Sequence, residues 1–261
     1  MSGQELKWTN WGRNQSCIPA RVIYPRDESD LIKAIKQAST DHLKVKAVGS
    51  GHSFTGIALT TGVQINLSRY NRVVDVDKEN MQATVQVGKV LSELNVELWQ
   101  HGLSMSNLGD IGYQTVAGAL STGTHGSGIK FGCLSNQVVA ARVITGEGEI
   151  VECSRDHDKD IFQSAIIGVG SAGILSTVTL QLEPAFNLHS VKTVESLESI
   201  LGNHELEIRN NDHFQYLCYP NNDRAYTKRF NRTIEETTKP HTESWFSANV
   251  TGRAKWLTRK H

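Results

Sequence analysis

The amino-acid sequence predicts a fold of the α+β class, because strand-like and helix-like stretches alternate without the regular order of a parallel sheet. Short runs of β-branched residues lie between turn signals and are typical of strands, and Gly146-Glu147-Gly148 is a hairpin signal. Apolar residues at helical spacing follow Asp27, a candidate N-cap, and a second amphipathic stretch covers about residues 90–101. A chain of 261 residues with 38% hydrophobic residues can form one large or two moderate domains.

The predicted elements form two domains, at residues 12–185 and 186–261. The boundary follows the alternating stretch 174–182, which ends near Pro184, and proline is a natural stop for a strand. In the second domain, one strand precedes a polar and charged segment that continues through Arg232 and carries no strand prediction. The expected strands lie at about residues 20–24, 45–48, 63–67, 73–76, 83–87, 138–145, 149–153, 174–182 and 213–219.

Two glycine-rich stretches are the most specific feature of the sequence. The first, Gly49-Ser50-Gly51-His52-Ser53, follows the apolar run 45–48, and the second spans residues 115–128. A glycine backbone can approach a ligand closely and adopt positive φ, while small hydroxyl residues donate hydrogen bonds, which suits phosphate oxygens. One such loop alone would be typical of a flexible turn. Two of them indicate a single extended anionic ligand.

Charge and cysteine usage exclude several classes of protein. Lys and Arg together number 27, as do Asp and Glu, so no charge excess attracts nucleic acid or an acidic membrane surface. The four cysteines are widely spaced without a CxxC pair, and no metal site is expected. The N-terminus lacks the pattern of a signal peptide, and no apolar run could span a bilayer. A cytoplasmic location is therefore expected, with peripheral membrane association left open.

A literal GxGxxG pattern occurs at Gly168-Val169-Gly170-Ser171-Ala172-Gly173. The Rossmann fingerprint requires a strand before the pattern and a helix after it, whereas residues 174–182 predict a strand here. The sequence also lacks GxxxxGK[ST] and GxSxG, the patterns of a P-loop and of a serine nucleophile elbow. A different kind of nucleotide site is required.

The order of the motifs resembles the FAD-binding, PCMH-type domain of the vanillyl-alcohol-oxidase flavoproteins, and within them the sugar-lactone oxidases that act on L-gulonolactone or D-arabinono-1,4-lactone. The residues that carry the resemblance are VGSGHSF at 48–54, MSNLGD at 105–110, TVAGALSTGTHGSG at 115–128 and GVGSAGILSTVTL at 168–180. It covers about residues 10–232. The resemblance implies a two-subdomain FAD-binding fold followed by an α+β substrate domain. That domain is C-terminally truncated, because the chain ends at His261 without the late His-Trp-x-Lys segment of these oxidases.

The resemblance implies FAD as the cofactor. His52 matches the histidine that is joined covalently to the flavin 8α-methyl group, and a neutral imidazole is a suitable nucleophile. The alternative is a loop histidine that only forms hydrogen bonds. For His125, ligand binding and a loop-shaping role stay equally open. The implied cofactor-binding residues are Gly49, Ser50, Gly51, His52, Ser53, Asp110, Thr115, Gly118, Thr122, Gly123, Thr124, His125, Gly126 and Ile174.

The implied reaction is oxidation of the CH–OH group of an aldonolactone or polyol, with dioxygen as acceptor and hydrogen peroxide as product. Gly109 matches a position beside the reactive flavin carbon where a small residue admits oxygen, although a simple turn glycine is the alternative. An unfinished substrate domain would expose apolar surface suited to self-association or to a complementing chain. Two other interpretations are a flavin-binding fragment or pseudoenzyme without turnover, and a peptidoglycan-precursor reductase of the same fold.

Overall fold

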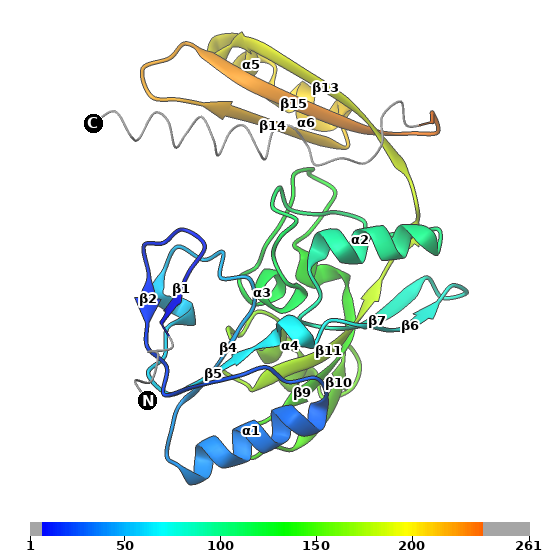
Figure 1. The fold of residues 1–261 in the computed structure, drawn as a ribbon. Coiled ribbons are helices and arrows are strands. Elements are labelled where there is room, and N and C mark those ends of the chain that lie inside the picture. The colour runs from blue at the N-terminus through cyan, green and yellow to red at the C-terminus, as the bar shows by residue number, and fades with distance from the viewer. Residues whose placement is uncertain (1–6, 237–261) are drawn as a thin grey trace. The chain divides into compact units, whose positions relative to one another are not determined.

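The computed structural model describes residues 7–236, which fall into two compact units (Figure 1). The first unit contains most of the chain up to Ala185. The second unit begins at Phe186 and also includes two short segments from earlier in the chain, residues 109–111 and 127–131. Within the described residues, no helix has the length and apolar character needed to cross a membrane.

The N-terminal part of the first unit is a parallel sheet in the order β3-β5-β4 (Arg21–Ile23, Val63–Asn66 and Val45–Val48). Helix α1 (Glu28–Thr40) connects β3 to β4, and the Asp27 side chain caps it by accepting a 3.0 Å hydrogen bond from the Asp30 amide. The predicted helix and its N-cap are therefore confirmed. The apolar positions that the helical spacing predicted are buried: Leu31, Ala34, Ile35 and Ala38.

The rest of the first unit is built on an antiparallel sheet in the order β10-β9-β11-β7-β6. The predicted hairpin is confirmed, because the Thr145 amide donates to the Glu149 carbonyl at 2.9 Å and Gly148 takes a φ of 75° in the turn. Strands β9 and β11 also pair antiparallel with each other. The five strands are β6 (Val73–Asp77), β7 (Gln82–Gln86), β9 (Val138–Ile144), β10 (Ile150–Ser154) and β11 (Ile174–Gln181).

Smaller elements cover and connect these two sheets. The amphipathic helix predicted at about residues 90–101 is α2 (Leu91–Gln100), and its predicted existence is confirmed. The sequence did not predict α3 within the second glycine-rich stretch, nor α4 before β11. The remaining elements are β1 (Trp8–Thr9), β2 (Ser16–Cys17), β8 (Leu103–Ser104), β12 (Glu183–Pro184), α3 (Val116–Ser121), α4 (Lys159–Ile166), and the 3₁₀ turns Gly56–Ala58, Leu67–Arg69 and Leu134–Gln137.

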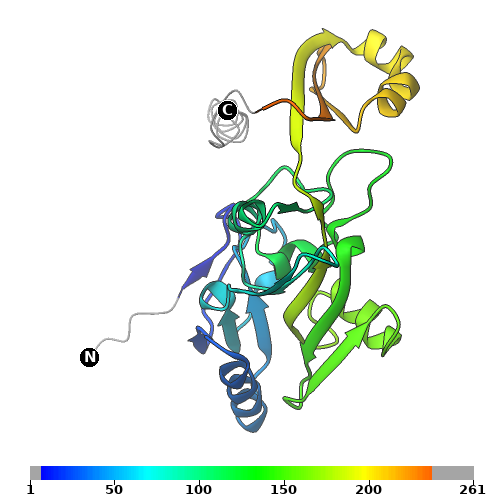
Figure 2. The same cartoon turned by 90° about the vertical axis from the view of Figure 1, so that its right-hand side faces the viewer.

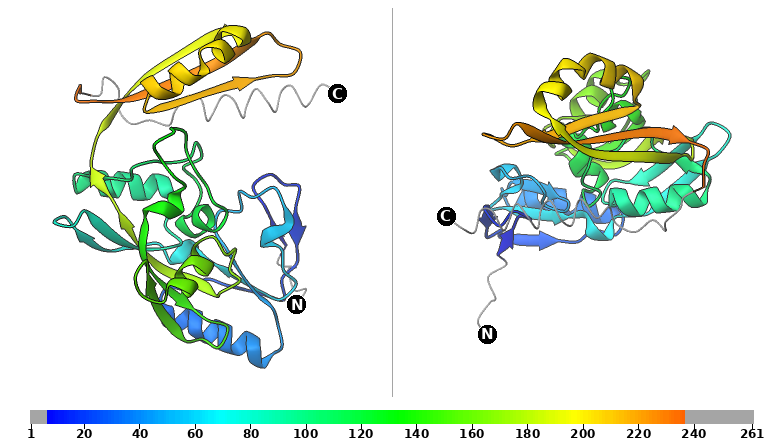
Figure 3. Two further views of the ribbon diagram at one scale, coloured as in Figure 1. Left: turned by 180° about the vertical axis from the view of Figure 1, so that it is seen from behind. Right: turned by 90° about the horizontal axis from the view of Figure 1, so that it is seen from above.

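A chain of polar side chains joins helix α1 to the antiparallel sheet, beside which α1 lies in the view from behind (Figure 3, left). The Tyr70 and Ser176 hydroxyls lie 2.7 Å apart, and Ser176 donates to Glu28 at 2.6 Å. Arg142 on β9 donates to both oxygens of Glu28, each at 2.9 Å. Tyr70 and Ser176 are almost fully buried, so these contacts provide the hydrogen bonds that their hydroxyls would otherwise make with water.

The second unit is a three-stranded antiparallel sheet in the order β13-β15-β14. Helices α5 (Leu197–Gly202) and α6 (His204–Asn210) lie on one face of this sheet (Figure 2) and enclose a small core around Phe214. The predicted strand at 213–219 corresponds to β14, but the polar segment that follows was wrongly left without a strand. The bounds are β13 (Asn187–Ser196), β14 (His213–Cys218) and β15 (Arg224–Thr233).

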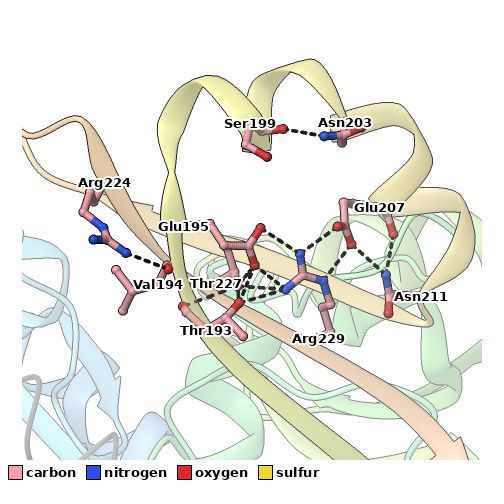
Figure 4. A network of polar contacts seen from close by, with 10 residues as sticks. All are labelled: Thr193, Val194, Glu195, Ser199, Asn203, Glu207, Asn211, Arg224, Thr227 and Arg229. Carbon is pink, nitrogen blue, oxygen red and sulfur yellow. Dashed lines mark hydrogen bonds and ion pairs between the residues drawn. The ribbon is translucent and has the colours of Figure 1, made fainter.

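Arg229 on β15 is the centre of a polar network that holds the second unit together (Figure 4). Its guanidinium group donates at 2.9 Å to Glu195 on β13, and at 2.7 Å to both carboxylate oxygens of Glu207 on α6. It also lies over the Phe214 ring, 5.3 Å from the centroid. The Arg229 hydrogen bonds lower the pKa values of both carboxyl groups. One side chain therefore links two strands to a helix.

Replacement of Arg229 should destabilise the second unit. In Arg229→Lys, the single ammonium group loses the planar fork that serves both carboxylates, and we expect a loss of about 1–3 kcal/mol in unfolding free energy. Arg209→Lys is a matched control, because Arg209 pairs with Glu205 at 3.2 Å and its side chain is 74% exposed. The control should change stability by less than about 0.5 kcal/mol. Equal denaturant unfolding curves for the two variants would contradict the assignment.

Candidate cofactor-binding site

Both glycine-rich stretches line one pocket in the first unit, with a cavity volume of about 180 Å³. The pocket lies between the end of β4, the N-terminal turn of α3 and the start of β11. Segments that are far apart in the sequence thus meet at one cavity, as expected for an extended ligand. The implied cofactor-binding residues that line it are Gly49, Ser50, Gly51, His52, Ser53, Thr115, Gly118, Thr122 and Ile174.

Gly49 and Thr115 bring the two stretches into contact. A Cβ atom at Gly49 would collide with the Thr115 side chain, with the hydroxyl oxygen as its nearest neighbour. Thr115 is itself the N-cap of α3, where its hydroxyl accepts a hydrogen bond of 3.2 Å from the Gly118 amide. The absence of a side chain at Gly49 is therefore what lets β4 end directly against the beginning of α3.

The N-terminal segment holds the first glycine-rich stretch from outside the pocket. The Trp11 amide donates to the Gly51 carbonyl at 2.9 Å, and the buried Asn10 side chain donates to the Ser53 carbonyl at 2.8 Å. Gly51 has a φ of 68°, in the left-handed region that favours glycine. Asn10 and Trp11 were not predicted as site residues, because neither lies in a recognisable motif.

His52 lines the pocket with its imidazole ring half-buried. The ring stacks on the indole of Trp11, with centroids 5.1 Å apart and an angle of 23° between the planes. Burial lowers the pKa of His52, because a charged imidazolium is poorly solvated there. The site therefore favours the neutral imidazole, which retains a nitrogen lone pair.

The end of the second glycine-rich stretch lies outside the residues that line this pocket. The Thr124 hydroxyl accepts a hydrogen bond of 3.1 Å from Gln114, and His125 Nδ1 lies 2.9 Å from the Gly126 carbonyl. At Gly126 a Cβ atom would collide with Asn107 and Leu108. Gly123, with a φ of 65°, forms the turn after α3. In the structure these four residues shape the loop and do not line the cavity.

Gly109 and Asp110 belong to the second unit, together with β15. The Asp110 carboxylate lies 3.4 Å from Nζ of Lys228, whose side chain is only 8% exposed. Burial lowers the pKa of Lys228, while Asp110 acts in the opposite direction. Asp110 therefore interacts with a buried cation of the second unit.

The charge of the pocket lining is asymmetric. Among the described residues that line it, Lys46 on β4 is the one Lys or Arg, and no Asp or Glu is present. The lining also provides the hydroxyls of Ser50, Ser53, Ser121 and Thr122 and the amides of several glycines. Such a surface suits an anion that is held by backbone and hydroxyl donors. Lys46 was not predicted as a site residue, because a single lysine in a strand is ordinarily a solvent-exposed residue.

Comparison with known proteins supports an FAD-binding domain in this chain. Residues 19–154 match the family model described as an FAD binding domain, and residues 178–257 match the model of D-arabinono-1,4-lactone oxidase. The second match continues to residue 257, so the limit placed at about residue 232 by the sequence analysis was too early. Among solved structures, cholesterol oxidase from Brevibacterium sterolicum aligns with a TM-score of 0.82 at 17% identity, over 97% of this chain and 54% of that chain. That likeness shows the fold alone.

Curated relatives extend the match over most of the chain. L-gulonolactone oxidase from Mus musculus is 34% identical over 241 residues, which is 92% of this chain and 54% of the relative. L-gulono-1,4-lactone dehydrogenase from Mycobacterium tuberculosis is 38% identical over 238 residues, or 91% of this chain and 54% of the relative. The chain thus spans about half the length of these relatives. From the match at residues 19–154, together with the pocket that those residues help to form, the chain belongs to the FAD-binding domain family of flavoproteins.

Proposed function

We propose that this chain is the cofactor-binding part of an FAD-dependent oxidoreductase that acts on the CH–OH group of an aldonolactone. The observation that carries the proposal is the convergence of both glycine-rich stretches on one pocket, whose lining within residues 7–236 contains a lysine and no carboxylate. The similarity to L-gulonolactone oxidase and to the D-arabinono-1,4-lactone oxidase model favours a sugar lactone over other alcohols. FAD, when bound, supplies the chemistry by accepting a hydride from the carbinol carbon and passing the electrons to an acceptor.

The residues of the pocket fit the diphosphate group of a dinucleotide cofactor. At Gly49 the backbone approaches Thr115 so closely that no side chain fits, which leaves amide groups as the surface of the first stretch. Successive amides and the N-terminal turn of α3 form the second wall. These donors would hold the diphosphate, because backbone N–H groups in a concave loop bind anionic oxygens without a cost in side-chain ordering.

His52 is the residue that we propose to carry the flavin covalently. Its neutral imidazole would provide the lone pair for a bond to the 8α carbon; the methyl group and the imidazole would each lose one proton, and the oxidised flavin ring would take up the two electrons. Stacking on Trp11 restricts the orientation of the imidazole ring. The nucleophile is therefore both deprotonated and oriented before the cofactor arrives. Asp110 and Gly109 are proposed to lie on the reactive side of the flavin, Gly109 as an oxygen-access position. The remaining residues of the second stretch are proposed to support the cofactor site by shaping its loop: Gly123, Thr124, His125 and Gly126.

The electron acceptor distinguishes two kinds of relative, because one is named an oxidase and the other a dehydrogenase. We propose dioxygen as the acceptor, with hydrogen peroxide as product, a cytoplasmic location, and a second chain segment or copy to complete the substrate site. The test is to purify the chain and to record its flavin absorbance. Oxygen consumption and dye reduction are then measured with L-gulono-1,4-lactone, D-arabinono-1,4-lactone and an alditol. A chain that binds no flavin would refute the proposal.

Gly49→Ala should remove cofactor binding, because the added methyl group prevents the close contact between the end of β4 and the start of α3. The added methyl group collides with Thr115, and relief of that collision must move either the strand end or the helix cap. We expect a loss of about 1–3 kcal/mol in stability and little bound flavin. Gly146→Ala is the control, because a Cβ there meets nothing within 4 Å. If both variants bind flavin as the parent does, the pocket is misassigned.

Covalent attachment should depend on pH through His52. Its lowered pKa means that protonation requires more acid than for a free histidine, so the rate should be constant in the neutral range and fall with a midpoint below the ordinary histidine pKa of about 6.5. The measurement is the flavin that stays with the denatured polypeptide after timed incubation of apoprotein with FAD. In Trp11→Ala, greater exposure of His52 should move the midpoint upward. Flavin that remains attached in His52→Ala would refute the covalent assignment.

A further inference from the structure

The Gly168-Val169-Gly170-Ser171-Ala172-Gly173 segment, which resembles a Rossmann fingerprint in sequence, has a different structural role. It connects the end of α4 to the start of β11, so it leads into a strand and provides no helix N-terminus. The rejection of a Rossmann site is therefore confirmed. The segment nevertheless lines the cofactor pocket through Val169, Gly170 and Gly173.

Val169 has an unusual backbone conformation. Its φ is 53°, in the left-handed region that β-branched residues rarely adopt, and Gly170 and Gly173 follow with φ values of 83° and 131°. A strained conformation at the wall of a pocket persists only when the surrounding structure holds it in place. At Gly173 a Cβ atom would collide with the Ile144 carbonyl, so the segment is also packed tightly against β9.

Lys46 is the side chain that holds this segment from across the pocket. Its Nζ donates a 3.1 Å hydrogen bond to the carbonyl oxygen of Val169, joining β4 to the strained loop. Lys46 is half-buried and lines the same cavity. A lysine ammonium has three N–H donors, and the hydrogen bond to the Val169 carbonyl uses one of them. This bond therefore fixes the charged group at the pocket wall while other N–H donors stay available for a ligand.

We propose that Lys46 is the cation that recognises the diphosphate of the dinucleotide, with the Val169 carbonyl holding its ammonium group in position. This inference rests on the proposed function, because it requires FAD in the pocket. The lining supplies no other Lys or Arg among the described residues and no carboxylate that would neutralise Lys46. Within FAD, the diphosphate is the part that carries negative charge at neutral pH. The strained backbone of Val169 places the carbonyl that orients this interaction.

The proposal requires that Lys46 contributes through its charge. Charge-assisted hydrogen bonds to phosphate oxygens are stronger than neutral ones, and added salt weakens the attraction between opposite charges by screening it. The glycine-rich stretches alone would provide uncharged donors. Loss of the ammonium group should therefore weaken FAD binding and reduce its dependence on ionic strength.

The test uses the 261-residue chain in the His52→Ala background, where flavin binding can be measured at equilibrium. Lys46→Met removes the charge and retains the length of the side chain, and Lys46→Arg retains the charge. Titration with FAD at several salt concentrations, followed by flavin fluorescence, gives the dissociation constant and its salt dependence. Lys33→Met on the exposed face of α1 makes the same change in net charge away from the pocket. Circular dichroism confirms folding of each variant.

We expect Lys46→Met to weaken FAD binding about tenfold or more, with a smaller salt dependence, and Lys46→Arg and Lys33→Met to remain within about threefold of the parent. Affinity in Lys46→Met that matches the parent would overturn the inference. An equal loss in the Met and Arg variants, with unchanged salt dependence, would also overturn it, because the lysine would then act only as a support for the loop. Failure of the unsubstituted 261-residue chain to bind FAD would instead refute the proposed function.

Discussion

The close approach of Gly49 to Thr115 is the constraint on which the cofactor pocket depends. Strand β4 ends at this point, and helix α3 begins at it, with the Thr115 hydroxyl already used as the helix cap. Any side chain at Gly49 would occupy the position of that hydroxyl. Both glycine-rich stretches can therefore present backbone amides to one cavity only while this contact stays free of side-chain atoms. Gly126, packed against Asn107 and Leu108, applies the same principle at the end of the second stretch.

The two sheets of the first unit must keep their positions relative to each other for the close contact of Gly49 with Thr115 to persist. The chain from Tyr70 through Ser176 and Glu28 to Arg142 joins α1 to β9 and β11. Hydrogen bonds from Arg142 lower the pKa of Glu28, so the carboxylate stays charged, while burial raises the pKa of Tyr70. Each of these four side chains has a hydrogen-bond partner, which is the condition under which buried polar side chains specify one arrangement.

Sequence patterns predicted the parts of the fold that depend on local chemistry. Asp27 caps a helix within its own turn, and Gly148 forms a hairpin turn with its neighbours, so each leaves a local signature. Strand β15 was missed because Arg229 and its neighbours appear solvent-exposed in sequence. The charge of Arg229 is paired with Glu195 and Glu207 from distant elements. Partners that come from elsewhere in the chain are not visible in a local window.

The same distinction applies to the candidate site. The glycine-rich stretches were found because their glycine and hydroxyl residues form a composition that is visible within a continuous segment. Lys46 and Trp11 were not found, because each acts on a residue that is distant in sequence: Lys46 on the Val169 carbonyl and Trp11 on His52.

The pocket and the Arg229 network lie in different units. All residues that line the pocket belong to the first unit, and the Arg229 network joins only elements of the second. The glycine-rich stretches, His52 and Lys46, which we propose to bind the diphosphate and the flavin, contribute to the pocket from within the first unit. Selection of a substrate requires groups that face the reacting carbon and that differ between relatives with the same cofactor. The buried Lys228 and its partner Asp110 show that the second unit can hold a charged pair close to its sheet. A change in substrate is thus compatible with an unchanged pocket in the first unit, because separate sets of interactions stabilise the two units.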